Sequence, residues 1–492
     1  MKMKILLINP PFERFKKTDN GYFPLGLGYL AAILEKENHF VRIYNADMGP
    51  ETKNFKTFTV LNRMKDHKIY LDALKNDEHY VWKEIRKVFI EFKPNVVCFS
   101  CTSDAYASAL KISKIIKKED PNCKIVFGGV HSTLLYSQVI KKSSIDFLIR
   151  GEGEKAIVEL VNAIEKKSGF EKIKGLSYKD KDKIIHNESR ELMENLDDLP
   201  LPAKHLVLFP ELYRPADMNL IIASRGCPFS CIFCASSKFW GRRYRTRSVE
   251  DIIHELKFII KTYNIKHFRF WDDIFTANKS KVIELCKSII KEKINKKVHW
   301  NCLTRIDVLD NEMLYWMKKA GCTKLCLGLE SGSDKVLKGM NKHITVDQIR
   351  KAVKNFRKKG FLIHGYFMCG LPFEEEEDIK KTIKLIKEIK PDVTMACILV
   401  PYPGTKVYQD LVEMGKLPEN YDWEIPLDPN KGWTEIPQEK FEKLALELIM
   451  TARKVSDKNV LHLMKMAWIY RTSLLQNPVR ILQEVRERIF KK

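Results

Sequence analysis

The sequence predicts an α/β protein with three parts: an N-terminal doubly wound, Rossmann-like parallel sheet, a partial (β/α)6 barrel and a C-terminal helical region. Short apolar runs alternate with helical periodicity over residues 1–170, and a second alternating series occupies 216–435. From 436 to 492 the periodicity is only helical. A polar hairpin pattern and a turn-rich stretch separate the two series, so we expect a linker at 171–215.

The first series predicts a parallel sheet whose strands end in small and polar residues. Ligands of such sheets bind beyond the carboxyl ends of the strands. The insert at 52–80 is irregular and stays unassigned. Strands are expected at Lys4–Asn9, Phe40–Asp47, Asn95–Cys101, Lys124–Val130 and Asp146–Arg150, with helices at Gly26–Lys36 and Ala105–Lys118. The candidate ligand-binding residues at the strand ends are Ser100, Thr102, Gly128, Gly129 and Glu152. Glycines there let backbone approach a large ligand closely.

The second series predicts six strands with helices between them, which fits a partial barrel. The active site of such a barrel lies at the carboxyl ends of its strands. The expected strands are Leu220–Ser224, His267–Trp271, His299–Thr304, Lys324–Leu329, Ile363–Met368 and Val393–Val400.

Three cysteines follow the first of these strands with the spacing CxxxCxxC: Cys227, Cys231 and Cys234. A structural zinc site normally has four protein ligands, and an electron-transfer iron-sulfur cluster usually has four cysteines. A cubane held by three thiolates leaves one iron open to a substrate. Pro228 disfavours a helix here, so the loop can wrap around a cluster. The alternatives are ordinary thiols or a zinc knuckle completed by a distant residue.

The remaining cysteines and the charge add little about function. Cys98 and Cys101 lie along one strand and are interpreted as core residues, and so are Cys302, Cys322, Cys326, Cys369 and Cys397. Twelve cysteines without a secretory signal or a long apolar run predict a cytoplasmic protein with reduced thiols. The net charge of +23 selects no partner. The basic amphipathic tail at 460–492 is expected to pack on the barrel, with a membrane surface as the alternative.

Together these motifs resemble the radical S-adenosylmethionine superfamily, in its branch with an N-terminal cobalamin-binding domain. The resemblance covers nearly the whole chain, and its most specific part is the cysteine motif. The other matching motifs are Ile5-Leu-Leu-Ile-Asn-Pro-Pro, Pro24-Leu-Gly-Leu-Gly-Tyr-Leu, Gly128-Gly-Val-His, Gly151-Glu-Gly-Glu, Trp271-Asp-Asp-Ile-Phe-Thr, Gly328-Leu-Glu-Ser-Gly-Ser and Pro401-Tyr-Pro-Gly-Thr.

The resemblance implies a [4Fe-4S] cluster on the three cysteines and S-adenosylmethionine at its open iron. The paired acids Asp272 and Asp273 are expected near its amino group, although an Asp before a helix also caps it. Glu330 and Ser331 are expected near its ribose or amino-acid part. Arg305 is a candidate for its carboxylate, or for an ion pair with Asp307 or Glu330.

The resemblance also implies cobalamin, although the Asp-x-His-x-x-Gly segment that ligates cobalt in many cobalamin proteins is absent. Cobalt would then have no His ligand from that motif. His131 lies in the glycine-rich stretch and is interpreted as a hydrogen-bonding residue.

We therefore predict a cobalamin-dependent C-methyltransferase that acts on an unactivated carbon. One alternative is ring formation, rearrangement or carbon-carbon coupling without methyl transfer, and another is a zinc-binding nucleic-acid module. The predicted partners are a small-molecule, lipid or peptide substrate and an external electron donor, with no nucleic acid. No side chain is predicted to act as a catalytic acid or base, and contact with a membrane surface stays open.

Overall fold

The computed structural model describes residues 2–19, 21–57 and 66–457, which fold into two compact units. The first unit comprises Met1–Asp217 with two later segments, Tyr402–Gly404 and Pro418–Asp428. The second unit comprises Met218–Pro401, Thr405–Leu417 and, among the described residues, the chain from Pro429 to Asp457.

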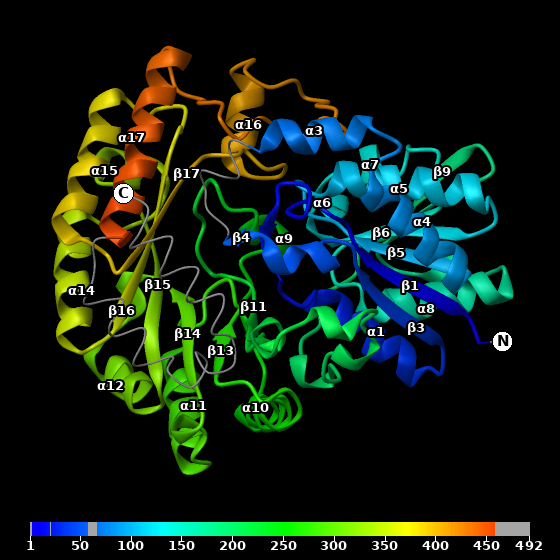
Figure 1. Ribbon diagram of the computed structural model, residues 1–492, viewed down its shortest axis with the longest axis horizontal. Coiled ribbons are helices and arrows are strands. Elements are labelled where there is room, and N and C mark those ends of the chain that lie inside the picture. Colours follow the sequence, from blue (N-terminus) through cyan, green and yellow to red (C-terminus); the bar gives the residue numbers. More distant parts are fainter. Residues whose placement is uncertain (1, 20, 58–65, 458–492) are drawn as a thin grey trace. The chain divides into compact units, whose positions relative to one another are not determined.

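The first unit contains a seven-stranded sheet in the order β3-β1-β5-β6-β7-β8-β9 (Figure 1). Strands β3, β1, β5, β6 and β7 are parallel to one another. Strands β8 and β9 add an antiparallel hairpin at the edge of the sheet. Four central residues of β1 are fully buried, because helices cover both faces of a doubly wound sheet. The bounds are β1 Lys4–Asn9, β3 Phe40–Asn45, β5 Val96–Ser100, β6 Lys124–Gly128, β7 Phe147–Ile149, β8 Leu176–Asp180 and β9 Lys183–His186.

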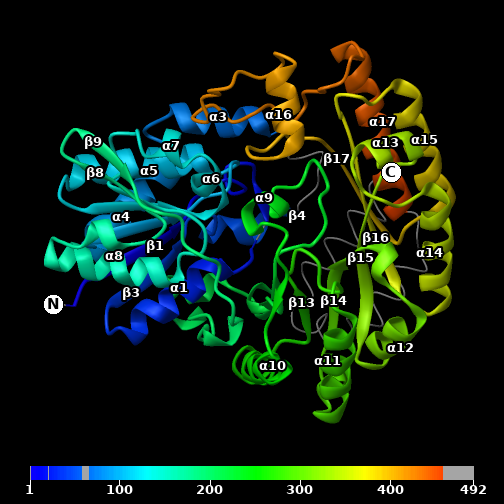
Figure 2. The same cartoon turned by 180° about the vertical axis from the view of Figure 1, so that it is seen from behind.

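Helices α1 and α8 pack together on one face of this sheet, and α4 and α5 pack together on the other (Figures 1 and 2). The helices are α1 Leu25–Lys36, α3 His67–Lys75, α4 Tyr80–Phe92, α5 Tyr106–Glu119, α6 Gly129–Leu134, α7 Tyr136–Val139 and α8 Glu154–Lys166. A small parallel pair, β2 Thr18–Asp19 and β4 Lys56–Thr57, lies outside the main sheet.

The second unit is built on a six-stranded parallel sheet in sequential order, β10-β13-β14-β15-β16-β17. Its bounds are β10 Leu220–Ile221, β13 His267–Phe270, β14 His299–Thr304, β15 Cys322–Glu330, β16 Leu362–Cys369 and β17 Val393–Ile398. A two-stranded antiparallel ribbon, β11 Ser224–Arg225 and β12 Arg245–Thr246, borders the cysteine loop.

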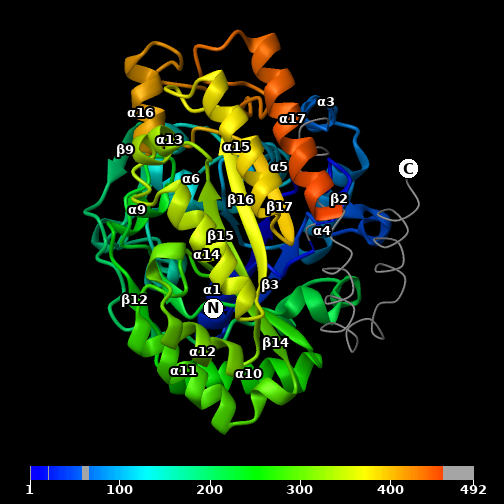
Figure 3. The same cartoon turned by 90° about the vertical axis from the view of Figure 1, so that its left-hand side faces the viewer.

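Amphipathic helices cover the outer face of this sheet (Figure 3). Ser248 caps α10 and a Thr345–Gln348 capping box opens α14. The described helices of the whole second unit are α9 Ser236–Trp240, α10 Val249–Tyr263, α11 Lys279–Lys291, α12 Asn311–Lys319, α13 Asp334–Gly339, α14 Val346–Lys358, α15 Glu376–Ile389, α16 Lys406–Glu413 and α17 Gln438–Asp457. Within the described ranges, no helix is long and apolar enough to span a bilayer.

The structure confirms the predicted fold class, with a Rossmann-like sheet and an open six-stranded barrel sheet. Its unit boundaries differ from those expected. The linker region up to Asp217 belongs to the first unit, and α17 packs against α15 and β17 within the second. The amphipathic tail predicted at 460–492 lies outside the described residues.

Candidate active site

The three cysteines of the CxxxCxxC motif lie in the loop between β11 and α9, and their thiols are free and partly buried. Burial raises the pKa of Cys227, and it raises the pKa of Cys234 to about 12. A cysteine binds metal as the thiolate. Binding of the cluster must therefore supply the free energy needed to deprotonate these partly buried thiols. Three unpaired thiols at the end of the first barrel strand fit a cluster with one open iron.

The cysteine loop is held on both sides by the rest of the second unit. The Ile232 N–H donates to the Met340 carbonyl at 3.1 Å, and the Ile232 carbonyl accepts from the Val407 N–H at 3.1 Å. The Asn341 amide donates to the carbonyl and the hydroxyl of Ser230 at 3.0 and 2.8 Å. The loop is therefore positioned by the protein itself.

The two acids after β13 occupy different environments. Asp272 is buried and accepts hydrogen bonds from the N–H of Ala223 at 3.1 Å and from the N–H and hydroxyl of Ser224. Burial raises the pKa of Asp272 to about 7, although the Ser224 hydroxyl opposes the shift. Asp273 is exposed, beside the N–H of Gly226, and its charge acts on Cys227 and Cys234. Asp272 thus anchors the start of the loop, while Asp273 faces the cysteines.

Arg305 connects the cysteine loop to the end of β14. Its Nη1 lies 3.6 Å from the Sγ of Cys231, and its guanidinium stacks on the Phe229 ring at 3.9 Å. The same guanidinium donates twice to Asp307, at 2.9 and 2.8 Å, and once to the Lys342 carbonyl. Of the two ion pairs considered from the sequence, the structure contains the one with Asp307.

Glu330 and Ser331, at the end of β15, both form contacts within the protein. The Glu330 carboxylate accepts from the buried Lys342 ammonium at 2.7 Å, and Glu330 has a positive φ of 63°. The Ser331 hydroxyl is fully buried and lies 3.1 Å from the Thr382 hydroxyl. These contacts favour a structural role for the Ser331 side chain.

The inner face of the barrel sheet carries a polar layer that we define as His267, Arg269, Asn301, Lys324, Cys326, His364 and Tyr366. On the opposite face, residues such as Phe268, Trp300 and Leu325 are fully buried beneath the outer helices. The layer is connected, because Asn301 Nδ2 lies 2.8 Å from His267 Nε2 and Cys326 Sγ lies 3.9 Å from His364 Nδ1.

Two of these side chains, Arg269 and Lys324, are cationic. Burial lowers the pKa of His267, and the charges of Lys324, His299 and Arg269 lower it further. Sequence reasoning identified the strands but missed this layer. The signal was the alternation of polar and apolar residues within His267–Phe270, His299–Thr304 and Leu362–Cys369, which assigns the polar residues to one face.

In the first unit, the predicted ligand-binding residues lie at the carboxyl ends of β5, β6 and β7. Thr102 is exposed, and Ser100 and Gly128 end the paired strands β5 and β6. Gly129 has a φ of 87°, and a Cβ there would lie 2.7 Å from the Cys101 nitrogen, so Gly129 serves internal packing. The Glu152 carboxylate accepts from the Met193 N–H at 2.7 Å, which ties this edge to the linker.

His131 follows this glycine pair and is fully buried. Its Nδ1 lies 2.9 Å from the Ser103 hydroxyl, and its ring stacks on Tyr106 at 4.3 Å. Burial lowers the pKa of His131 to about 3, so the imidazole is neutral. The structure agrees with a packing and hydrogen-bonding role. The carboxyl edge of β5, β6 and β7 thus offers backbone and hydroxyl groups to a large bound molecule. The Asp-x-His-x-x-Gly segment, whose His would coordinate cobalt, is absent from the sequence.

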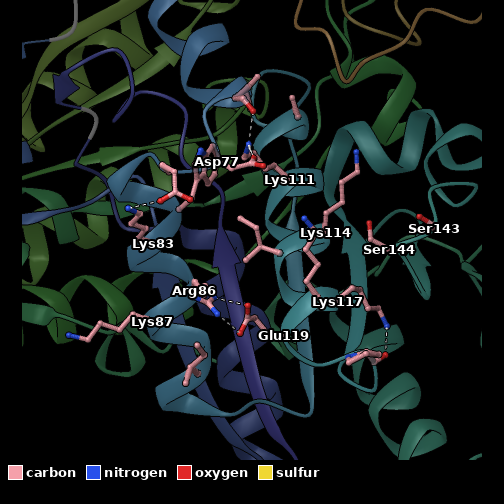
Figure 4. A pocket seen from close by; sticks show the side chains of 18 of the residues that line it. Asp77, Lys83, Arg86, Lys87, Lys111, Lys114, Lys117, Glu119, Ser143 and Ser144 are labelled. Carbon is pink, nitrogen blue, oxygen red and sulfur yellow. Dashed lines mark hydrogen bonds and ion pairs between the residues drawn. The ribbon is translucent and has the colours of Figure 1, made fainter.

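A hollow of about 1340 Å³ lies on the first unit over α4 and α5 (Figure 4). Its cations are largely neutralised by acids on the same surface. Arg86 pairs with Glu119 at 2.6 Å, and Lys114 pairs with Glu424 at 2.8 Å. We assign it no ligand.

Of the nine other cysteines, eight are buried and one, Cys397, is partly buried. The buried ones include Cys98, Cys101, Cys302, Cys322, Cys326 and Cys369. Throughout residues 2–19, 21–57 and 66–457, no group of three or more His, Cys, Asp or Glu side chains converges as around a single metal ion.

Two family models match the chain, one in each unit. The B12 binding domain matches residues 16–161, and the radical SAM superfamily matches residues 221–386. The first match contains the strand ends with Ser100, Gly128 and Glu152. The second contains the cysteine loop, Asp273, Arg305 and Glu330.

Similar proteins match both units together. An uncharacterized methyltransferase of Pyrococcus horikoshii is 33% identical over 449 residues, 90% of each chain. The anaerobic magnesium-protoporphyrin IX monomethyl ester cyclase of Rubrivivax gelatinosus is 30% identical over 365 residues, covering 72% of this chain and 64% of the cyclase. The radical S-adenosylmethionine methyltransferase TsrM of Kitasatospora setae, solved with cobalamin and a [4Fe-4S] cluster, matches with a TM-score of 0.66 at 18% identity. That match covers 84% of this chain and 75% of TsrM, and it shows a shared fold.

Proposed function

Because this chain belongs to the radical S-adenosylmethionine superfamily, in the branch with a B12-binding domain, we propose that it is a cobalamin-dependent C-methyltransferase. The observation that carries the proposal is the presence of both family matches in one chain, together with the 33% identical relative that is named a methyltransferase. We infer that the carbon it methylates is unactivated, because radical chemistry is needed only where no acid or base can remove the proton.

Cys227, Cys231 and Cys234 hold the [4Fe-4S] cluster in this proposal. When bound, the cluster supplies the electron that cleaves S-adenosylmethionine, and cobalamin supplies the methyl group. The protein contributes position and charge. The contacts of Asn341 and Ile232 fix the loop, and the Arg305 guanidinium offers positive charge and a hydrogen bond to the thiolate of Cys231.

Two of the three acids bind S-adenosylmethionine in this proposal, and the third positions the cysteine loop. Asp273 is exposed beside the cysteines and accepts hydrogen bonds from the ammonium of the methionine part. Asp272 holds the loop through Ala223 and Ser224. Glu330, fixed by Lys342, is placed at the same edge of the sheet and accepts from the ribose hydroxyls.

In the first unit, the proposed cobalamin-binding edge contains Ser100, Thr102, Gly128, Gly129 and Glu152, of which Gly129 and Glu152 shape the edge through contacts within the protein. Their position beyond parallel strands supports this assignment. The substrate is a small molecule in this proposal, as the tryptophan and porphyrin-ester names of similar proteins suggest. The inner polar layer of the barrel faces it. Contact with lipid, peptide or a membrane surface stays a prediction.

Product analysis tests the proposal. Anaerobically reconstituted protein should contain iron and sulfide. With cobalamin, its substrate, a one-electron reductant and S-adenosylmethionine, which is both the methyl donor and the radical source, it should yield a methylated product, S-adenosylhomocysteine and 5′-deoxyadenosine. Cys231→Ala should lose the cluster absorption while the first unit still binds cobalamin. A cyclised or coupled product without S-adenosylhomocysteine would replace methyl transfer by the alternative chemistry of the cyclase relatives. Zinc in place of iron and sulfide would contradict the radical assignment.

A further inference from the structure

We propose that the exposed basic surface beside the cysteine loop is the docking surface for an acidic, one-electron carrier protein. We define this surface, the loop-side basic surface, by Lys238, Arg242 and Arg243. The inference rests on the proposed function, because it requires a cluster on Cys227, Cys231 and Cys234.

The backbone places this surface directly against the cysteine loop. Gly226 precedes Cys227 and has a φ of 94°, and a Cβ there would overlap the carbonyl oxygen of Arg243. The β11–β12 ribbon continues the contact, with Arg225 opposite Arg245. Lys238 lies in α9, which begins two residues after Cys234. The loop-side basic surface is thus fixed at both ends of the motif.

The charges of this surface are available to a partner. Lys238, Arg242 and Arg243 are exposed, and none of them forms an ion pair within the part of the chain that the structure describes. The hollow over α4 and α5 differs, because Arg86, Lys111 and Lys114 are paired there with acids (Figure 4).

A second hollow, of about 890 Å³, reaches the cysteine loop. Pro228, directly after Cys227, is exposed and forms part of its wall, with Tyr244, Lys279 and Lys287. Lys287 is exposed, and its ammonium lies 5.0 Å from the Trp316 ring. Lys279 pairs with Asp310 and Glu312, and Glu284 pairs with Lys281, so these acids are already engaged. Lys287 therefore adds a cation that forms no ion pair within the described residues, near the exposed Pro228 that is bonded to Cys227.

This arrangement fits an acidic electron carrier better than other partners. Electron transfer requires only a close approach of two redox centres, and Pro228 offers a short covalent route to the Cys227 sulfur. Complementary charge accelerates and orients such encounters, and it can raise association rates by about 10- to 1,000-fold at low salt. One electron leaves the reduced carrier, which becomes oxidised, and reduces the cluster by one electron. No proton or further reactant is needed.

The test compares two reductants on the reconstituted full-length protein. An acidic FMN carrier protein of the flavodoxin type, photoreduced to its hydroquinone, and dithionite are each mixed with the wild type and with Arg242→Glu/Arg243→Glu under anaerobic stopped flow. Reduction of the cluster is followed by its absorbance and by EPR. A matched control, Lys354→Glu/Lys358→Glu, makes the same charge change at two exposed lysines of α14 on the outer helical layer.

We expect the double arginine variant to slow reduction by the carrier about tenfold or more, while its reduction by dithionite stays at the wild-type rate. The wild-type rate with the carrier should fall as salt rises, since the Debye length shortens from about 30 Å at 0.01 M to about 10 Å at 0.1 M. Binding of the oxidised carrier, measured by calorimetry, should weaken in parallel. Arg242→Gln/Arg243→Gln should give an intermediate effect.

Equal carrier rates in the two double variants, or a carrier rate that does not depend on salt, would overturn the docking surface. Binding of a random RNA oligomer that weakens in Arg242→Glu/Arg243→Glu, with no effect on the carrier, would also overturn it. Failure of the proposed function looks different: the wild type would then show no iron-sulfur spectrum that dithionite can bleach.

Discussion

Arg305 lies with its Nη1 3.6 Å from the Sγ of Cys231, and the same guanidinium is held by two hydrogen bonds to Asp307. A cation fixed at this distance stabilises negative charge on the sulfur. We therefore predict that Arg305→Met lowers the reduction potential of the bound cluster, since net charge and hydrogen bonds to the sulfurs set that potential.

The shift should be at most on the order of 100 mV, because a charge-assisted hydrogen bond contributes about 1.5 to 3 kcal/mol and 59 mV corresponds to a tenfold change for one electron. An EPR-monitored redox titration measures it. Arg305→Lys is the control, since it keeps the charge without the two-point bond to Asp307 and should shift the potential less. An unchanged potential in Arg305→Met would show that Arg305 only supports the loop.

The buried ion pair between Glu330 and Lys342 supplies a second prediction. The two charges are 2.7 Å apart and both side chains are largely shielded from water. Removing one partner leaves an uncompensated buried charge, which costs about 3 to 5 kcal/mol. Lys342→Met should therefore lower the free energy of unfolding by about that amount, as measured by urea denaturation of the second unit's transition.

The double variant Glu330→Gln/Lys342→Met should recover part of this loss, because no buried charge remains. Equal stability of the single and the double variant would mean that the pair is not coupled. If Glu330→Gln weakens binding of S-adenosylmethionine while the fold stays intact, the carboxylate has the proposed contact with the cofactor.

Much of this site was predictable from the sequence, because it depends on local patterns. The spacing of Cys227, Cys231 and Cys234 after a short strand placed the loop correctly at the carboxyl edge of the barrel. Period-two and helical periodicities gave the strands, since β1 and β14 match their expected bounds residue for residue.

The rest depends on contacts between residues far apart in the chain. No sequence pattern indicates that Lys342 would neutralise Glu330, or that Asn341 would hold Ser230, 111 positions away. The sequence also did not indicate that Pro418–Asp428 packs with the first unit. That packing includes ion pairs of Glu424 with Lys114 and Lys142, which are far away in the chain. Asp272 and Asp273 look equivalent in the sequence, and only burial separates the anchor from the exposed acid.

Glu374 makes the stability of the second unit depend on pH. Its carboxyl is buried and accepts hydrogen bonds from the N–H groups of Gly370 and Leu371. Burial raises the pKa of Glu374 to about 8, although these N–H groups oppose the shift. In the unfolded chain the pKa returns to about 4.3.

The unfolded state therefore releases its proton first as the pH rises, and unfolding becomes easier. The contribution of Glu374 lowers stability between about pH 4.3 and 8, by at most about 1.4 kcal/mol per pH unit, and is constant above pH 8. Glu374→Gln should remove this slope and be more stable than the wild type at pH 8. Urea midpoints of the two proteins from pH 5 to 9 provide the measurement, and parallel curves would contradict the assignment.

The inner polar layer of the barrel gives the last prediction, which concerns the substrate. Arg269 and Lys324 lie on one row of this layer, on either side of Asn301, because Arg269 pairs with Asn301 and Asn301 with Lys324 across β13, β14 and β15. Two cations on the face opposite the helices suit a carboxylate or phosphate of the substrate. Arg269→Met and Lys324→Met should each lower methyl transfer about tenfold or more, as expected for the loss of a hydrogen bond to a charged group.

The cluster and the cleavage of S-adenosylmethionine without substrate should be unaffected, because Arg269 and Lys324 lie within β13 and β15 and not in the loops that follow these strands. Chromatography of 5′-deoxyadenosine and of the methylated product in one reaction separates the two effects. Lys257→Met, at an exposed position of α10, serves as the matched control. Equal losses of cleavage and methylation would mean that the layer supports the fold, whereas a selective loss of methylation identifies it as the substrate-binding face.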